Sequence, residues 1–492
     1  MLRDVRAPVV GQGGSAGRNG ASLALQKIVR RLSARQPLAW TKGSGEGPAL
    51  RRALGWPALT AIGLGTMLGG IFPTIGAGAH AAGPAVVLSY ALSGAVSLCV
   101  AFCYAEFASM VPVAGSAYTY AYATLGELAA WIIGWDLILE YGLSVAPTAS
   151  SWSDYLQHLL ADAGVHLPVL LRTGHAWGAH PQFDLVAALV TVAITLLVAA
   201  GIRESSSING ALVIFQILTM IVFLTALAGA VHPAYSHPFA AHGWHGILTG
   251  TAIVFYAYIG FDTVTVASEE AHNPKRDVPI GIIAALIVGG VLYVALAYVT
   301  AGAVPFQRLS AGAAMLDAVS GAHGSRLVYW IVALGGIAGN TTVMLTSLLG
   351  QIRIFYVMAR DRMLPPGVAR IHPRTRTPFT MTIVTGTAVA VLAACLPLTD
   401  LLNFVNIGTL SAFGIVCLGV FILRFAAPEA VRPFRAPLLP LFSLLGAAAC
   451  FYLISGLDVW AWVRFAVWFT IGIAAYAAYG YRRSRLREAA NG

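Results

Sequence analysis

Twelve apolar stretches, each about as long as a membrane-crossing helix, account for most of this 492-residue chain. A helix rises 1.5 Å per residue, so about 20 apolar residues cross the hydrocarbon core of a bilayer. Inside that core the backbone must pair its amides and carbonyls within the protein, and a single stretch does so as a helix. Charged residues make up 10% of the chain, where a soluble domain has about 25%. These features predict an all-α integral membrane protein with 12 transmembrane helices. The spans are predicted at about residues 56–82, 84–110, 121–147, 183–200, 208–231, 246–268, 279–304, 328–358, 381–397, 401–425, 438–456 and 461–480.

The basic residues predict how these spans are oriented. An even number of spans puts both termini on one side of the membrane. If that side is the cytoplasm, Arg172, Arg308, Arg326 and Arg464 are the only ones of the 30 lysines and arginines that lie outside. Cytoplasmic loops carry an excess of these residues. We therefore expect a multi-pass protein of the plasma (inner) membrane, with N- and C-termini in the cytoplasm. The net charge of +10 reflects this topology, and no nucleic-acid partner is expected.

The first span is difficult to complete as a helix. Its stretch Gly63–Gly76 reads GLGTMLGGIFPTIG, and each glycine costs about 1 kcal/mol against alanine in a helix interior. We therefore expect a break near Gly69-Gly70. A break would direct the amides of one half-helix at a ligand and leave carbonyls free on the other. Close helix packing through small residues explains many membrane glycines as well, but glycines and Pro73 coincide here in one short window, which favours the break.

A second interrupted span is predicted in the sixth stretch, Thr251–Glu270. Asp262 follows Gly260-Phe261 near its middle, and a charge there is costly unless it faces the interior of the bundle. If spans 1–5 and 6–10 form two inverted halves, the two interrupted helices occupy corresponding positions. Interrupted segments at matching places in two halves are the sequence sign of a transporter's substrate site.

Several polar residues lie inside predicted spans. Glu140, in GWDLILEYG, is either a counter-charge for a basic substrate, a proton carrier, or a structural hydrogen-bond partner, and Asp136 lies one turn earlier on the same face. In span 8, Asn340 is a candidate pocket contact. The hydroxyls of Thr341, Thr342, Thr346 and Ser347 can line a pocket, coordinate a cation or bond the preceding carbonyls.

Other chemistry is not indicated by the sequence. The five cysteines lie in apolar spans and suggest no disulfide framework. There is no nucleophile elbow, no phosphate-binding glycine loop with a lysine and no Cys/His metal pattern. An enzyme, a metal site and a resident cofactor are therefore not expected.

Four motifs resemble one known family, the cationic amino acid transporters of bacteria and animals, within the amino acid–polyamine–organocation superfamily. The longest is CYAEFASMVPVAGSAYTYAYATLGELAAWIIGWDLILEYG (Cys103–Gly142). The others are GIRESSSINGALVIF (Gly201–Phe215), GFDTVTVASEEAHNPKRDVPIGI (Gly260–Ile282) and GQIRIFYVMARDRMLP (Gly350–Pro365). The resemblance extends from about Leu50 to Tyr481.

The resemblance implies a LeuT-like five-plus-five inverted repeat, with helices 1 and 6 interrupted, two extra C-terminal helices, and alternating-access uptake of amino acids. The chain would then divide into a disordered basic tail (1–52), a ten-helix transport core (53–425), helices 11 and 12 (426–481) and a basic tail (482–492). Both tails would be cytoplasmic. The partners would be an amino acid substrate and the bilayer, with monomer and dimer both open.

The resemblance also implies a substrate site. The substrate carboxylate would meet the amides of Gly69, Gly70 and Ile71. Its amino group would meet carbonyls around Ile62-Gly63 or Leu64-Gly65, and around Phe255, Tyr256, Ala257 and Tyr258. Its side chain would project toward Glu140, Tyr256 and Asn340.

The chain departs from the family at Gln216, where bacterial members often have a lysine that couples transport to protons. An amide does not titrate, so that route is expected to be absent. A proton would then use Glu140, Asp262 or His80, or sodium would bind near Thr341 and Thr342. A facilitator or exchanger, a polyamine or organic amine carrier, and a non-transporting amino acid receptor are the alternatives.

Overall fold

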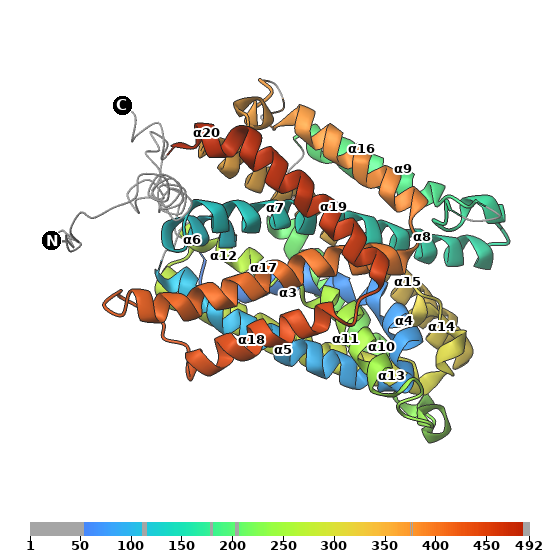
Figure 1. Cartoon of the computed structure of the whole chain (residues 1–492). Helices are drawn as coiled ribbons and strands as arrows, with labels where there is room; N and C mark the ends of the chain where they lie inside the picture. Colours follow the sequence, from blue (N-terminus) through green and yellow to red (C-terminus); the bar gives the residue numbers. More distant parts are fainter. Residues whose placement is uncertain are drawn as a thin grey trace, which may run out of the picture.

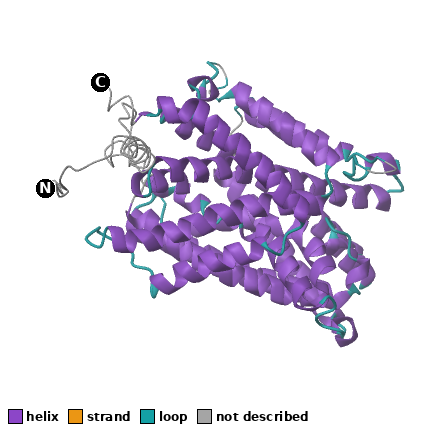
Figure 2. Ribbon diagram, viewed as in Figure 1, coloured by secondary structure: helices purple, strands orange, loops and turns teal. Residues whose placement is uncertain are grey.

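The computed structural model describes residues 54–110, 116–177, 181–201, 206–373, 375 and 377–485. The predicted tail 1–52 and most of the tail 482–492 lie outside these residues. Regular structure within them is helical, and extended pairing is confined to two isolated bridges, Leu54–Ala271 and His175–Gln182 (Figure 2). The predicted all-α class is confirmed.

The described helices follow one another along the chain as labelled in Figure 1. They are α3 (Trp56–Met67), α4 (Ile71–Ala82), α5 (Val86–Met110), α6 (Ser116–Thr124), α7 (Glu127–Leu143), α8 (Val145–Asp162), α9 (Leu185–Ala199), α10 (Ser206–Leu227), α11 (Gly243–Val254), α12 (Thr263–Val266), α13 (Pro274–Ala303), α14 (Ala314–Gly321), α15 (Arg326–Arg360), α16 (Phe379–Cys395), α17 (Leu398–Ala426), α18 (Leu439–Ile454), α19 (Val459–Ala475) and α20 (Tyr481–Arg483). The short 3₁₀ turns used below are η1 (Leu68–Gly70) and η6 (Phe255–Tyr258).

Within the described residues, eight helical segments are long and apolar enough to cross a membrane. One of them, Trp56–Met110, is 55 residues long and contains the first two predicted spans. The fourth, ninth and eleventh predicted spans coincide with the shorter apolar helices α9, α16 and α18. Each predicted span therefore overlaps a described helical segment, and the multi-pass membrane architecture is confirmed.

The third span differs from its predicted bounds. It was expected at about 121–147, but the helical segment runs from Glu127 to Asp162. It begins late because Gly126 has φ +109°, which ends the preceding helix. It continues because hydroxyls in its polar second half bond other segments: Ser151 donates to the Gly312 carbonyl at 2.7 Å and Ser153 to Asp184 at 2.7 Å.

Local sequence explains where several helices begin. Asp458 precedes α19 and accepts a hydrogen bond from the Ala461 amide at 2.6 Å. Ser325 caps α15 through the Val328 amide, and Pro274 occupies the first position of α13, where a missing amide hydrogen costs nothing.

The interruption in the first helix is less complete than predicted. α3 ends at Met67 and α4 begins at Ile71, but the intervening η1 turn stays right-handed, with φ −57° at Leu68 and −68° at Gly70. The helix tightens by one 3₁₀ turn rather than unwinding. It does so because its glycines are held by neighbours on several sides, as described below for the site.

The interruption in the second helix is complete. After α11 the chain makes the η6 turn, Ile259 is extended at ψ 140°, and Gly260 has φ +111°. The chain resumes as the one-turn helix α12. The predicted break around Phe255–Asp262 is confirmed.

The two interrupted helices lie inside the bundle, as Figure 1 shows, with α9 and α16 along one edge and α5 and α18 along the opposite edge. They cross at their interruptions, because a Cβ on Gly70 would lie only 2.8 Å from the Cα of Ala257. The core of the protein is therefore built around these two irregular segments.

Candidate functional site

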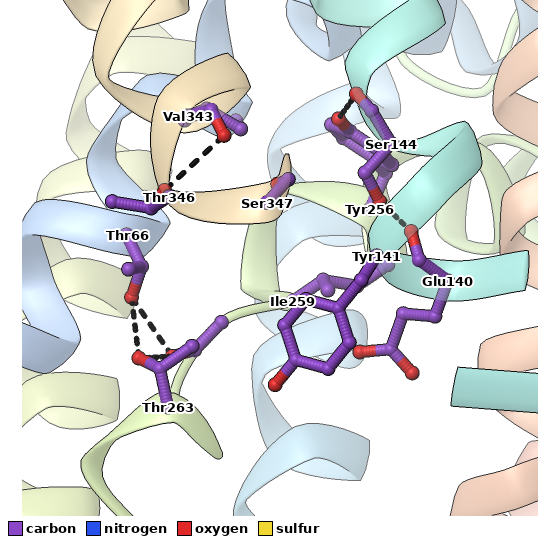
Figure 3. Close-up of a pocket in the computed structure, with 12 residues that line it drawn as sticks. Thr66, Glu140, Tyr141, Ser144, Tyr256, Ile259, Thr263, Val343, Thr346 and Ser347 are labelled. Carbon is purple, nitrogen blue, oxygen red and sulfur yellow. Dashed lines mark hydrogen bonds between the residues drawn. The ribbon is translucent and has the colours of Figure 1, made fainter. Parts of the chain in front are cut away.

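A small cavity lies where the two interrupted helices cross. Its volume is about 30 Å³, room for one or two water molecules. The wall is formed by residues from α3 and η1, from α7 and its end, from η6 to α12, and from α15 (Figure 3). The lining residues are Thr66, Gly70, Glu140, Tyr141, Ser144, Tyr256, Ile259, Gly260, Thr263, Val343, Thr346 and Ser347.

Thr66 connects the two interrupted helices at the floor of the cavity in Figure 3. Its hydroxyl lies 2.8 Å from the Gly260 carbonyl oxygen and 2.9 Å from the Thr263 hydroxyl. Gly260 must be glycine here, because φ is +111° and a Cβ would lie 3.0 Å from the Thr66 side chain. The unwound segment is thereby fastened to α3.

The glycines of the first helix allow close packing as well as a break. A Cβ on Gly63 would lie 2.8 Å from Val264 Cγ2 on α12. A Cβ on Gly69 would lie 2.6 Å from the Gly339 carbonyl oxygen on α15. The two interpretations of this glycine-rich stretch are therefore both correct: small residues bring three helices together, and the helix is interrupted at that contact.

Glu140 is the charged residue of the cavity wall. Its side chain is fully buried, and neither carboxylate oxygen accepts a hydrogen bond from a described residue. Thr409 lies beside it on α17, but its hydroxyl donates to its own helix, at 3.2 Å from the Val405 carbonyl oxygen. A buried carboxylate without donors is unfavourable, so this site is arranged to receive a cation or a proton.

Asp262 adjoins the cavity without lining it. Its Oδ2 accepts a hydrogen bond from the Tyr141 hydroxyl at 2.7 Å, and Tyr141 itself lines the cavity beside Glu140 (Figure 3). The carboxylates of Asp262 and Glu140 therefore approach the same place from different helices. Asp136 is also buried, one turn before Glu140 on α7.

Of the predicted site residues, Gly70, Glu140 and Tyr256 line the cavity. Tyr256 is fastened there by its hydroxyl, which donates to the Ser144 carbonyl at 2.7 Å. The structure places the other predicted contacts in the surrounding packing. They are Ile62, Gly63, Gly65, Gly69, Ile71, Phe255, Ala257, Tyr258, Asp262 and Asn340.

Two of the carbonyls predicted to be free for an amino group, those of Gly63 and Ala257, already accept side-chain hydrogen bonds in this structure, and so does the neighbouring Met67 carbonyl. The Tyr293 hydroxyl lies 2.6 Å from the Met67 carbonyl oxygen and 3.0 Å from that of Ala257. Thr66 donates to the Gly63 carbonyl at 2.9 Å. Tyr258 turns away from the cavity and donates to the Tyr90 carbonyl at 2.8 Å. A ligand that uses these carbonyls must displace such contacts.

Asn340 and its neighbours face away from the cavity. The amide of Asn340 donates to the Ser151 hydroxyl at 3.1 Å, which joins α15 to α8. The hydroxyls of Thr341 and Thr342 donate to carbonyls one turn back, at 2.7 and 3.0 Å. In the described residues, no group of three or more His, Cys, Asp or Glu side chains is placed to hold a metal ion.

Gln216 lies on α10, opposite the interrupted turn of the first helix. Its side chain is fully buried, and neither its amide nitrogen nor its oxygen bonds a described residue. A Cβ added to Gly339 would lie 3.6 Å from its nitrogen, and Gly339 in turn packs on Gly69. The position therefore faces the turn that the family resemblance assigns to the substrate carboxylate.

Of the span 8 hydroxyls that the sequence marks as candidates for a pocket, the structure places two in the cavity wall. Thr346 and Ser347 line it, whereas Thr341 and Thr342, from the same run of hydroxyls, do not. The helical spacing from Val343 to Ser347 would have identified the correct face, given one known member. The remaining lining residues, Thr66, Tyr141, Ser144, Ile259 and Thr263, become recognisable only when the helices are placed.

One end of the molecule is closed by the segment before α14. His80 Nε2 lies 2.6 Å from the Leu309 carbonyl oxygen, and His158 Nε2 lies 3.2 Å from Asp317 Oδ1 on α14. The Ser310 amide donates to Asp317 Oδ2 at 2.6 Å. Burial opposes ionisation of Asp317, but the bonds from His158 and Ser310 outweigh it and lower the pKa of its carboxyl. His80 belongs to this closure and not to the cavity.

Several known proteins similar to this chain are named as permeases or transporters. A family model described as amino acid permease matches residues 54–480. The chain is 40% identical to the branched-chain amino acid permease BcaP of Bacillus subtilis (strain 168), over 94% of its own length and 99% of that protein. It is 38% identical to the methylthioribose transporter of the same organism, over 93% and 99%. It is 37% identical to the vacuolar cationic amino acid transporter 4 of Arabidopsis thaliana, over 78% and 66%.

Proposed function

The chain belongs to the amino acid permease family, and we propose that it carries cationic or broadly neutral L-amino acids across the plasma membrane by alternating access. It is an amino acid transporter and not an enzyme, and the family resemblance stated from its motifs is confirmed. The finer proposal rests on one observation. A cavity lies between two interrupted helices, and in it Glu140 is buried without a hydrogen-bond donor among the described residues.

The transport core is a five-plus-five inverted repeat within 12 spans. The two interrupted helices cross at their interruptions, which supports their place as the first helix of each half. α18 and α19 are the two extra helices. The C-terminal residues lie on the side where α7 begins and α15 ends: Ser484 donates to Glu127 at 2.7 Å, and the Arg485 amide donates to the Asp361 carbonyl at 3.1 Å. This end faces the cytoplasm and carries both termini.

The cavity is contracted in this conformation. A volume of about 30 Å³ holds water but not an amino acid. Substrate binding therefore requires α3 to separate from the unwound segment at Thr66 and Gly260, whose 2.8 Å hydrogen bond closes the floor. The widened site would place the substrate carboxylate by Gly70 and its side chain by Glu140.

The chemistry of the substrate side chain depends on the charge state of Glu140. An ionised Glu140 would pair with the ammonium or guanidinium group of a basic amino acid. A protonated Glu140 would accept a neutral side chain. The relatives' names include a branched-chain permease and a cationic transporter, so both classes occur among similar proteins.

Proteoliposomes test the function and the substrate class together. Purified protein is reconstituted into liposomes, and the proteoliposomes are preloaded with each common L-amino acid in turn. Counterflow of external labelled L-lysine and L-leucine is then measured. For a basic substrate, we expect Glu140→Gln to lower lysine counterflow about tenfold or more, since it removes a buried ion pair worth several kcal/mol. Asp162→Asn is the matched control, since this carboxylate ends the same helical segment outside the cavity.

Three outcomes separate the alternatives. Agmatine and cadaverine, which lack the carboxylate of arginine and lysine, compete better than their parent amino acids only if the protein is an amine carrier. Binding that shifts the melting temperature without any counterflow indicates a receptor. Counterflow without accumulation under a proton or sodium gradient indicates an exchanger or facilitator, which the amide at Gln216 makes a real alternative.

A further inference from the structure

Asp136 is a buried carboxylate that the substrate site does not use. It lies one turn before Glu140 on α7, 1% exposed, and neither of its oxygens accepts a hydrogen bond from a described residue. It does not line the cavity. An ionised carboxylate in such a position is strongly unfavourable inside a membrane, and a proton removes the charge.

The polar groups around Glu140 are carboxyls and hydroxyls, and they include no basic counter-charge among the described residues. Around Glu140 lie Asp262 from the unwound segment, Tyr104 from α5, the Thr409 hydroxyl from α17, and Asp136 and Tyr141 from its own helix. For Asp136, Glu140 is the neighbouring charged group. No described lysine or arginine pairs with either carboxylate.

The two side chains are arranged along one line. Residues four apart on a helix lie on the same face, about 6 Å apart along the axis. Glu140 opens onto the cavity, and Asp136 lies closer to Glu127 and Ser484, at the end of the molecule that we assign to the cytoplasm. The pair therefore leads from the substrate site toward that end.

We propose that Glu140 and Asp136 form a two-step proton path, so that the transporter is driven by protons through α7 and not through position 216. This inference rests on the proposed transport function. Glu140 takes a proton from water in the outward-open cavity. Asp136 starts protonated and gives its proton to cytoplasmic water when the cytoplasmic side opens. The Glu140 O–H bond then breaks as a new O–H bond forms on Asp136 through one bridging water, so Asp136 is protonated again and Glu140 is ionised again. Charge balances, because one proton crosses with each substrate and each carboxylate returns to its starting state.

The path requires a proton carrier that Gln216 does not supply. Its amide is buried opposite the first interrupted helix and has no titratable group. Asparagine at position 136 is nearly isosteric with aspartate but cannot carry the proton. Asp136→Asn should therefore separate proton movement from substrate movement.

The test compares three readouts in proteoliposomes at zero membrane voltage, with L-leucine and L-lysine as probes. They are counterflow, accumulation driven by an acidic exterior, and acidification of trapped pyranine. One proton per substrate and a gradient of one pH unit should give about tenfold accumulation by wild-type protein. For Asp136→Asn we expect counterflow within about twofold of wild type, but neither accumulation nor acidification. Asp400→Asn is the matched control and should retain all three, since Asp400 pairs with Arg464 at the surface, 2.6 Å away.

Each remaining outcome contradicts the path. Wild-type counterflow without acidification excludes proton coupling, whatever the variants do, and this measurement needs no variant to fold. Accumulation by Asp136→Asn with an unchanged pH profile shows that the proton goes elsewhere. Loss of counterflow in a variant that still melts cooperatively shows a structural or binding role. If wild-type protein shows no counterflow of any amino acid, the proposed function fails instead, so the two failures are distinguishable.

Discussion

At the scale of single residues, two buried glutamates show how surroundings decide a role. Glu106 is 1% exposed, yet Arg424 donates two hydrogen bonds to it at 2.6 and 2.9 Å, and the Ala436 amide adds a third. Glu140 is equally buried and accepts none from the described residues. Glu106 is thus a completed structural ion pair, whereas Glu140 is available to a ligand or a proton.

Arg432, the second partner of Glu106, should be important for the stability of the folded protein. Its Nε lies 3.2 Å from Glu106 Oε1, and its other nitrogens donate to four carbonyls at and beyond the end of α17. Arg432→Met leaves buried acceptors unsatisfied, and we expect a loss of about 3–5 kcal/mol of stability. Thermal unfolding in detergent measures it. Arg464→Met is the control and should cost about 0–1 kcal/mol, because its pair with Asp400 is partly exposed; equal costs for the two variants would contradict this account.

At the scale of elements, the two interrupted helices differ because their neighbours differ. The first is enclosed on several sides, with Gly63 against Val264, Gly69 against Gly339 and Gly70 against Ala257, and it stays helical through a 3₁₀ turn. The second unwinds at Ile259-Gly260, where Thr66 supplies a hydroxyl for the Gly260 carbonyl. Unwinding therefore occurs where a partner satisfies the freed backbone.

Gly260 should not tolerate a side chain. Gly260→Ala places a non-glycine residue at φ +111°, with a new Cβ 3.0 Å from Thr66. We expect a loss of about 1–3 kcal/mol and reduced counterflow, since the strained segment is also the cavity wall. Gly210→Ala is the control: nothing lies within 4 Å of its added Cβ, and alanine is favoured in α10 by about 1 kcal/mol. A Gly260→Ala protein as stable and active as wild type would show that the segment has another conformation.

At the scale of the whole molecule, contacts gather at two ends of the helix bundle. At one, Glu127, Ser484 and Asp361 join segments far apart in the chain. At the other, the segment before α14 joins α4 through Leu309, and α14 itself joins α8 through Asp317. Alternating access requires one such end to open while the other stays closed, and the narrow cavity lies between them.

The closure at Asp317 should weaken in acid. The carboxyl pKa is lowered in the folded protein, so its contribution is present above the unfolded value of about 3.9 and is lost as the pH falls through the lower folded value. We expect Asp317→Asn to lower the melting temperature at pH 7, and the difference from wild type to shrink below about pH 4 and vanish below the lowered folded pKa. Melting curves at pH 7, 5 and 3 test this; a constant difference at every pH would exclude the titration of Asp317 as the cause.

The sequence by itself determined the all-α membrane class, the approximate positions of the apolar helical segments and the place of both interruptions. The length and apolar character of each span can be read from its own residues, because the bilayer requires every span to be long enough, apolar and internally hydrogen-bonded. Gly260, as part of an interrupted span, and the family motif that contains Glu140 were also identified from local sequence, without knowledge of the tertiary contacts. Of the candidate site, Gly70, Glu140 and Tyr256 were identified in this way.

Only the tertiary structure decided which side chains meet. Asn340 and Thr346 lie on the same helix, but rotation of α15 about its axis turns Thr346 into the cavity and Asn340 toward Ser151. The Tyr293 hydroxyl, from α13, occupies carbonyls of both interrupted helices, at Met67 and Ala257, which no local pattern in either helix indicates. Sequence patterns report what a residue needs, an apolar surrounding or a partner. Which residue becomes that partner depends on how helices distant in the chain are rotated and packed against one another.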